Sequence, residues 1–290
     1  MSDARSTTVL GTASAAGAYA LWGLFPLYFK AVAHVPAVEV LAHRITWTMV
    51  LMAGVIAVLR HWRRVVAAFA DRRVAGGLVL AAAVITVNWG VFIWAIAVGR
   101  VLESSLGYFI NPLVSVVLGV VVLSEWLRPL QWGGVGLAAA GVAYQVVAAG
   151  VFPWVSLTLA ISFGIYGLLR KIVTVDPTTG LFVETLVLAP FAAGYLLVLM
   201  AGGSGAMGQA GWATTLLLLA GGPLTALPLL MFVAGAQRIR LSTLGLLQYI
   251  VPTAHFLLAV FAFGEAFTVH TLVTFACVWA ALGLYAVSGR

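Results

Sequence analysis

Long apolar segments alternate with short polar connections along the whole chain. The segments fall at residues 9–29, 38–58, 75–98, 104–123, 130–149, 154–170, 180–200, 212–234, 242–263 and 269–288. No Asp, Glu, Lys or Arg occurs in residues 129–169 or 185–237, so no water-facing helix surface can be drawn there. Because about 20 apolar residues cross a bilayer core as a helix, the pattern predicts an all-α integral membrane protein with ten transmembrane helices.

Polar positions inside these segments recur between the two halves of the chain. Pro112 is followed by Glu125, and Pro252 by Glu265, at the same spacing of 13 residues. An offset of 141 residues also relates three earlier positions to later ones, namely Trp22-Gly23 to Phe163-Gly164, Lys30 to Lys171 and Pro36 to Pro177. These matches indicate an internal repeat.

The offset divides the chain into a first repeat, residues 1–149, and a second repeat, residues 150–290. Five helices per repeat is an odd number, so the second repeat enters the membrane from the opposite side and the two are inverted. Inverted repeats are typical of secondary transporters, in which the substrate site lies at the repeat interface near the membrane midplane.

The composition agrees with a bilayer environment, since 63% of the residues are hydrophobic and only 8% are charged. The single Cys277 excludes an intramolecular disulfide and a cysteine-based metal cluster. The net charge of +7 could suggest nucleic acid, but most basic residues lie in the short connections between apolar segments. We therefore expect no nucleic acid partner, and interpret the basic residues as signals of membrane topology.

The basic residues fall almost entirely on one side of the predicted membrane. With the N-terminus inside, Lys30 and Arg100 lie outside, against twelve basic residues inside. The twelve are Arg5, Arg60, Arg63, Arg64, Arg72, Arg73, Arg128, Arg170, Lys171, Arg238, Arg240 and Arg290. The positive-inside rule then places both termini in the cytoplasm. The run at residues 60–64 is interpreted as an orientation signal in contact with lipid headgroups.

Several longer motifs resemble one transporter family along nearly the whole chain. They lie at residues 19–30, 39–44, 88–95, 102–113 and 241–253, and include Asn88-Trp89, Tyr108-Phe-Ile-Asn111-Pro112 and Gln248-Tyr249. They resemble the RarD branch of the EamA family, within the drug/metabolite transporter superfamily. The resemblance implies a permease of the bacterial inner membrane, with ten helices in two inverted five-helix repeats, that exports small molecules.

Arg44 is the one basic residue well inside a predicted span. A charge at that depth normally faces a cavity or a partner and is a candidate functional group. One alternative is a structural ion pair with Glu39 or Glu103; the others are an anchor for a substrate carboxylate or phosphate and a part in gating.

His43 and Glu184 occupy corresponding positions of the two repeats. Both can titrate, so protons are a candidate coupling ion, and both are candidates for coupling or gating. The alternative for each is a hydrogen-bonded polar residue close to the headgroups. Arg44 and Glu184 are expected on opposite sides of the midplane, where they cannot pair directly.

Amides and aromatic rings share helix faces at two places, with Asn88 beside Phe92 and Asn111 beside Tyr108. Apolar walls with a few polar groups suit a small amphiphilic ligand, although Asn also joins helices within bilayers. Further candidate substrate-binding residues are Trp22, Trp89, Tyr166, Gln248 and Tyr249.

Three prolines are candidates for helix bends connected with gating. Pro26 follows Gly23 in the first segment, a combination that favours a kink or a close helix approach. Pro112 and Pro252 each deprive a carbonyl one turn earlier of its helical donor. We expect their helices to bend there and to line a central cavity from opposite halves.

Two classes of function are compatible with these features. The first is a secondary transporter that exports small amphiphilic metabolites or drugs, amino-acid-like or chloramphenicol-like, by alternating access. The alternative is an intramembrane lipid-modifying enzyme, for which Glu39 and His43 form the only nearby acid–base pair we identify. No Gly-x4-Gly-Lys-Ser/Thr or His-Glu-x-x-His motif is present, so no cofactor or metal is expected. The expected partners are the lipid bilayer and a small-molecule substrate, for a monomer or homodimer.

Overall fold

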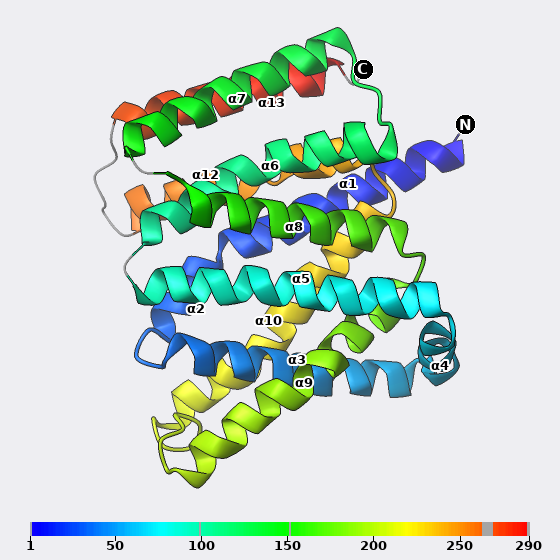
Figure 1. Ribbon diagram of the computed structural model, residues 1–290, viewed down its shortest axis with the longest axis vertical. Helices are drawn as coiled ribbons and strands as arrows, with labels where there is room; N and C mark the ends of the chain where they lie inside the picture. The colour runs from blue at the N-terminus through cyan, green and yellow to red at the C-terminus, as the bar shows by residue number, and fades with distance from the viewer. Residues whose placement is uncertain (1, 99, 151, 263–268, 289–290) are drawn as a thin grey trace.

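The computed structural model describes residues 2–98, 100–150, 152–262 and 269–288, and every regular element in these ranges is a helix (Figure 1). The helices are α1 (Ser2–Gly23), α2 (Phe25–Ala31), α3 (Ala37–Val58), α4 (Trp62–Ala70), α5 (Arg72–Ala97), α6 (Val101–Leu123), α7 (Pro129–Ala149), α8 (Trp154–Ile172), α9 (Pro177–Ala201), α10 (Trp212–Ala236), α11 (Leu241–Leu247), α12 (Ile250–Leu257), the π-helix η1 (Leu258–Ala262) and α13 (Val269–Ser288).

The prediction of an all-helical membrane protein is confirmed, but the count of ten spans is not. Within the described residues, eight helical segments are long and apolar enough to cross a membrane. They include α1 with α2 as one segment and α11 to η1 as another. The helix α7 is not among the eight, and the described apolar part of α13 is a shorter stretch, Leu272–Val287. Glu265 lies outside the described residues.

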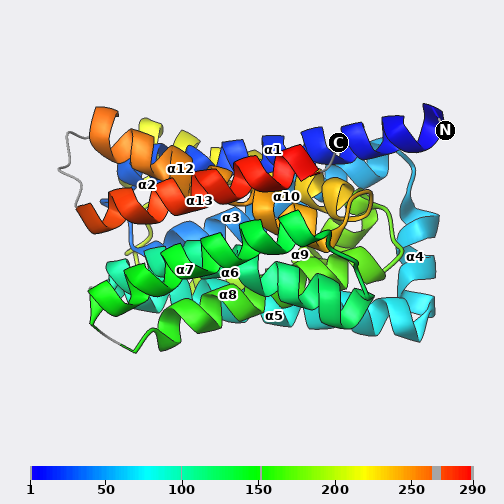
Figure 2. The ribbon, with the colours of Figure 1, turned by 90° about the horizontal axis from the view of Figure 1, so that it is seen from above.

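Most of the long helices run in roughly one direction, α9 and α10 run obliquely to them, and α4 crosses the end of the bundle (Figures 1 and 2). The start of α1, the end of α13 and α4 all lie at this end. We call it the α4 end, and we call the end with α2 and the α9–α10 connection the α2 end. The helix α4 is absent from the segments predicted from apolar length, because it is short and rich in arginine.

Most helices pack against partners distant in sequence. The helix α1 packs on α10, α3 lies against both α9 and α10, and α8 contacts α5 and α6. The helices α6 and α11 form another pair, and α7 packs with α13 along one side of the molecule.

Small residues allow two of these pairs to approach closely. A Cβ atom on Gly222 of α10 would lie 2.8 Å from the Trp47 backbone of α3. One on Gly245 of α11 would lie 2.5 Å from the Ser115 Cβ atom and 2.9 Å from the Pro112 carbonyl of α6. Close backbone approach through small residues is a usual way to join helices in bilayers.

The three prolines affect their helices differently. Leu24 separates α1 from α2, and Pro26 occupies the first turn of α2. The helix α6 continues through Pro112, whereas the corresponding segment of the second half is interrupted at Gln248 and Tyr249, between α11 and α12. Pro252 cannot donate to the Gln248 carbonyl, which instead accepts from the Val251 amide at 2.9 Å. Both Pro112 and Pro252 are buried within the protein.

Candidate functional site

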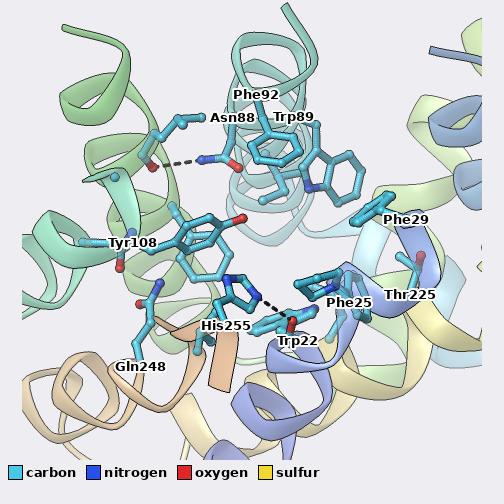
Figure 3. Close-up of a pocket in the computed structure, with 18 of the residues that line it drawn as sticks. Trp22, Phe25, Phe29, Asn88, Trp89, Phe92, Tyr108, Thr225, Gln248 and His255 are labelled. Atoms are coloured by element: carbon cyan, nitrogen blue, oxygen red, sulfur yellow. Dashed lines mark hydrogen bonds between the residues drawn. The ribbon is translucent and has the colours of Figure 1, made fainter. Parts of the chain in front are cut away.

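A cavity of about 250 Å³ lies in the middle of the bundle (Figure 3). Residues from both halves of the chain line it. Nine of the candidates from the sequence are among them: Trp22, Pro26, Arg44, Asn88, Trp89, Phe92, Tyr108, Asn111 and Gln248. Lining residues that the sequence did not single out include Phe25, Phe29 and Thr225. Phe163, the counterpart of Trp22 in the repeat, and His255, which follows Pro252 on the same helix face, also line it. Arg44 is the only formally charged side chain among the described lining residues.

Arg44 is held by a hydroxyl group and three aromatic rings. Its Nε atom donates to Thr225 Oγ1 at 2.9 Å. The guanidinium carbon lies 5.4 Å from the Phe25 ring centre, 5.5 Å from that of Phe29 and 5.9 Å from that of Trp89. These distances are within the range of cation–π attraction. Arg44 is therefore fixed in place by neutral groups at the cavity wall.

The alternative of an ion pair between Arg44 and Glu39 does not match the contacts of Glu39. One Glu39 carboxylate oxygen accepts from the Ala206 amide at 2.6 Å, in the connection between α9 and α10. The same oxygen lies 3.8 Å from His43 Nε2, and His43 Nδ1 accepts from Trp47 Nε1 at 3.3 Å. The side chain of Glu103 lies outside the described residues. Glu39 and His43 thus join helices near the α2 end and do not line the cavity.

The two asparagines join helices and also face the cavity. Asn88 Nδ2 donates to the Leu159 carbonyl and to Ser162 Oγ, each at 2.9 Å, and Asn111 Nδ2 donates to the Ala160 carbonyl at 3.0 Å. Both side chains therefore bind α8 while they also line the cavity. Their amide nitrogens position α5 and α6 against α8.

A second polar group of side chains lies across the cavity from Phe29 and Thr225 (Figure 3). It contains Gln248, Tyr108 and His255. Gln248 Oε1 is buried and has no hydrogen-bond partner among the described residues, so it can accept from a ligand. His255 Nε2 lies 3.4 Å from the Trp22 carbonyl, and its ring meets the Tyr108 ring edge-on at 5.8 Å.

The remaining candidates lie away from the cavity. Tyr249 is fully buried and its hydroxyl donates to the Phe109 carbonyl at 3.2 Å, which ties the α11–α12 interruption to α6. Pro112 and Pro252 are buried but do not line the cavity. Tyr166 and Glu184 belong to a separate buried group toward the α4 end.

This buried group is centred on an ion pair between α8 and α9. Arg170 Nε lies 3.2 Å from Glu184 Oε1, and the Tyr166 hydroxyl donates to Glu184 Oε2 at 3.1 Å. Arg170 is 0% exposed, and Gly180 makes room for it, since a Cβ atom there would lie 2.4 Å from its Nη atoms. None of its three guanidinium nitrogens has a hydrogen-bond partner among the described residues. Arg170, which the sequence counts among the basic residues of the inner side, is therefore a buried member of a structural ion pair.

A layer of aromatic rings separates the cavity from this ion pair. It consists of Tyr19, Trp22, Phe163, Tyr166 and Phe232, with neighbouring ring centres 5.4 to 6.1 Å apart. Trp22 and Phe163 line the cavity, while Tyr19 and Tyr166 each lie about one turn further toward the α4 end. We call these five residues the aromatic layer.

Comparisons with known proteins identify the family. The EamA-like transporter family matches residues 9–146. The chain is 48% identical to an uncharacterized transporter of Vibrio cholerae, over 96% of this chain and 92% of that one. It is 44% identical to Protein RarD of Escherichia coli, over 98% of this chain and 95% of that one. It is 34% identical to the Chloramphenicol-sensitive protein RarD of Pseudomonas aeruginosa, over 90% of this chain and 88% of that one. A solved structure described as "Crystal structure of protein" shares the fold, with a TM-score of 0.70 at 18% identity over 99% of both chains. The chain therefore belongs to the RarD branch of the EamA-like transporter family, in the drug/metabolite transporter superfamily, and is a membrane transporter.

Proposed function

We propose that this transporter is a secondary carrier that moves small amphiphilic molecules with an acidic group through the central cavity by alternating access. The observation that carries the proposal is the cavity wall, where Arg44 is the one formally charged side chain among the described lining residues and lies amid aromatic rings. A guanidinium can form two parallel hydrogen bonds to a carboxylate. The rings would supply apolar contact area, as small-molecule sites generally do.

The two inverted repeats, residues 1–149 and 150–290, are supported by the packing of the helices. The 141-residue offset relates α1 to α8, α5 to α10, and α6 to α11 and α12. Under this relation, the α1–α10 contact corresponds to the α8–α5 contact, and α8–α6 corresponds to α1–α12. The pairs α3–α9, α6–α11 and α7–α13 each correspond to themselves. Such a pattern is what a two-fold axis between the halves would produce.

Alternating access requires a barrier on one side of the cavity at a time. The aromatic layer lies on the α4 side of the cavity and is joined to the Arg170–Glu184 pair through the Tyr166 hydroxyl. We assign Glu184 to this inner gate, so that the gate opens when the pair separates. Glu184 and His43 are the candidate proton carriers. The candidate hinges are the helix breaks next to Pro26 and Pro252, and Pro112 inside α6.

The orientation follows from the arginines at the α4 end. We propose that this end faces the cytoplasm of a bacterial cell, with the protein in the inner membrane. Cysteines introduced at Arg64 and Arg240 on a Cys277→Ala background should be protected from impermeant thiol reagents outside intact cells. A cysteine at Gly203, in the α9–α10 connection, should be labelled. Labelling of the cysteines at positions 64 and 240 from outside would show that the α4 end faces the outside of the cell, opposite to the proposed orientation.

Reconstitution tests the function directly. The purified protein in liposomes should move an acidic amphiphile across the membrane without changing it chemically, and Arg44→Gln should abolish the movement. Candidate solutes can first be selected by thermal shift among amino acids, organic acids, nucleosides and chloramphenicol, because a ligand of the folded state raises its stability. Recovery of a chemically modified lipid or solute would instead favour the intramembrane enzyme.

A further inference from the structure

The helix α4 differs from all the long helices in direction and in character. It joins the end of α3 to the start of α5 and lies across the bundle axis at the α4 end (Figure 2). One of its faces packs inward, where Val65 and Ala68 are buried in the main hydrophobic core. With nine residues, it is far too short to span a bilayer. Its position is therefore that of a helix at the membrane surface.

A second face of α4 is apolar and uncovered. Trp62 is 48% exposed, Val66 67% and Phe69 45%. Their spacing of four and three residues places them on one side of the helix. A short helix with such a face beside basic residues is the usual form of an interfacial membrane helix, whose apolar side enters the boundary between headgroups and acyl chains.

The residues around this face are strongly basic. Residues 60–73 contain five arginines and one aspartate, a local charge of 5 − 1 = +4. All five arginine side chains are exposed. The aspartate, Asp71, uses Oδ1 to accept from the Arg73 amide at 2.8 Å and the Val74 amide at 3.3 Å, at the start of α5. The positive charge is thus directed outward around the apolar face.

The helix α4 is also joined to the start of α9. The Trp62 ring meets the Phe182 ring edge-on at 5.8 Å, and Arg64 Nη1 lies 3.7 Å from Asp176 Oδ2. Asp176 caps α9 by accepting from the Thr179 amide at 3.0 Å. The helix α9 carries Glu184, so a ligand that holds α4 also holds the helix that contributes the carboxylate of the buried ion pair.

We propose that α4 and its flanking arginines form a docking surface for anionic phospholipid headgroups, and that bound lipid stabilises the α4–α9 contact. The apolar face of Trp62, Val66 and Phe69 would enter the bilayer surface, while Arg60 and Arg63 bind the headgroup phosphates. Charge complementarity identifies the partner, because arginines close to an anionic membrane surface are attracted to its headgroups. Lipid binding at this surface would stabilise the α4–α9 contact whatever solute the cavity carries.

Thermal unfolding of the reconstituted full chain tests this surface. Replacing part of the phosphatidylcholine by phosphatidylglycerol should raise the Tm of the wild type, and Arg60→Gln/Arg63→Gln should lose at least half of that increase. The control, Arg238→Gln/Arg240→Gln, removes the same charge from exposed residues at the same end of the molecule and should keep most of the increase. Equal losses in the two variants, or no lipid effect in the wild type, would overturn the proposal.

A second measurement keeps the test decisive if the arginine variant does not fold. A fluorophore on Val66→Cys, in the Cys277→Ala background, should be quenched at least twofold more by brominated phosphatidylglycerol than by brominated phosphatidylcholine. A fluorophore on Phe191→Cys, at a 78% exposed position well inside α9, should be quenched equally by both lipids. No headgroup preference at Val66, or the same preference at both positions, would contradict a specific anionic surface.

Discussion

Two arginines, the buried Arg170 and the half-buried Arg44, lie inside the helix bundle, and their surroundings differ in the way that matters for function. Arg170, toward the α4 end, lies 3.2 Å from the Glu184 carboxylate and is sealed from solvent. Arg44, at the cavity wall, is held by the Thr225 hydroxyl and by aromatic rings. A guanidinium whose counter-charge comes from the chain has its partner already. One that is positioned by neutral groups beside a cavity can take its counter-charge from a ligand.

The largest effect should come from removing the carboxylate partner of Arg170. Loss of one partner leaves an uncompensated buried charge, which typically costs about 3–5 kcal/mol. Glu184→Leu should therefore lower the free energy of unfolding by about that amount, measured by titration with a denaturing detergent. The double variant Arg170→Leu/Glu184→Leu should recover most of the loss, because an apolar pair can replace a buried ion pair. Arg44→Leu should cost less than half as much. A Glu184→Leu protein as stable as the wild type would refute the structural role of the pair.

A smaller effect is expected from crowding Arg170 without changing any charge. A methyl group on Gly180 would overlap the Arg170 guanidinium, and overpacking of this kind costs about 1–3 kcal/mol. Gly180→Ala should lower thermal stability and weaken the Tyr166–Glu184–Arg170 group. Gly54→Ala is the matched control, because nothing lies within 4 Å of a Cβ atom at that glycine. If both substitutions raise stability through helix propensity alone, the close packing around Arg170 is not as described.

On the cavity side, Thr225 allows the positioning of Arg44 to be tested separately from its charge. Thr225→Val removes the acceptor of the Arg44 Nε hydrogen bond, a loss of about 1 kcal/mol. The affinity for an acidic ligand should fall by roughly fivefold, measured by isothermal titration. Thr225→Ser keeps the hydroxyl and should bind as the wild type does. Unchanged affinity in the valine variant would mean that the aromatic rings alone fix Arg44.

The smallest effect concerns an arginine–carboxylate pair nearer the surface, formed by the exposed Arg64 and the half-buried Asp176. Burial by itself would raise the pKa of Asp176, but hydrogen bonds from Thr178 and Thr179 and the charge of Arg64 outweigh it and hold the pKa below its usual value. A carboxyl group with a lowered folded pKa contributes stability above its unfolded pKa of about 3.9. That stability is lost as the pH falls through the folded value.

We expect this contribution to be at most about 1 kcal/mol, since solvent reaches the pair through the exposed Arg64 side chain. Asp176→Asn keeps a capping side chain, so it should remove part of the Tm decrease between about pH 5 and 2 while changing the Tm at pH 7 only slightly. Asp71→Asn serves as the control for acid effects elsewhere. An acid profile of Asp176→Asn identical to that of the wild type would show that Asp176 contributes nothing through ionisation.

The sequence predicts the setting of one of the two arginines, Arg44, but not that of the other, Arg170. Arg44 stands alone inside an apolar segment, and that isolation marked it for a cavity or a partner. Arg170 precedes Lys171 at the end of a segment, where basic residues normally indicate topology. Its partner, Glu184, lies on the next helix, and no pattern within α8 reports that contact. Arginines near span ends therefore need the neighbouring helix before they can be interpreted.

The residues of the cavity wall also divide into those that could be predicted from the sequence and those that could not. Asn88 and Asn111 can be predicted because each amide shares a helix face with an aromatic ring, and Gln248 because it lies in the corresponding part of the second half. Phe25 and Phe29 cannot, because an aromatic residue in a span can face lipid, core or cavity with the same local pattern. Tyr249 was chosen by its position after Gln248, but the helix break there turns its hydroxyl to the Phe109 carbonyl. The all-helical membrane fold follows from hydrophobic length, whereas side-chain direction depends on helix breaks that the sequence does not locate.

The most direct test of the central claim compares Arg44 with lysine at the same position. Lysine keeps the charge but cannot form two parallel hydrogen bonds to a carboxylate. With a zwitterionic or acidic ligand, Arg44→Lys should lose most of the ligand-induced Tm shift of the wild type. With a neutral amphiphile such as chloramphenicol, the two proteins should shift equally. Equal shifts for both ligand classes, together with a lower basal Tm for the lysine variant, would show that Arg44 is a structural brace and not the anchor for an acidic group.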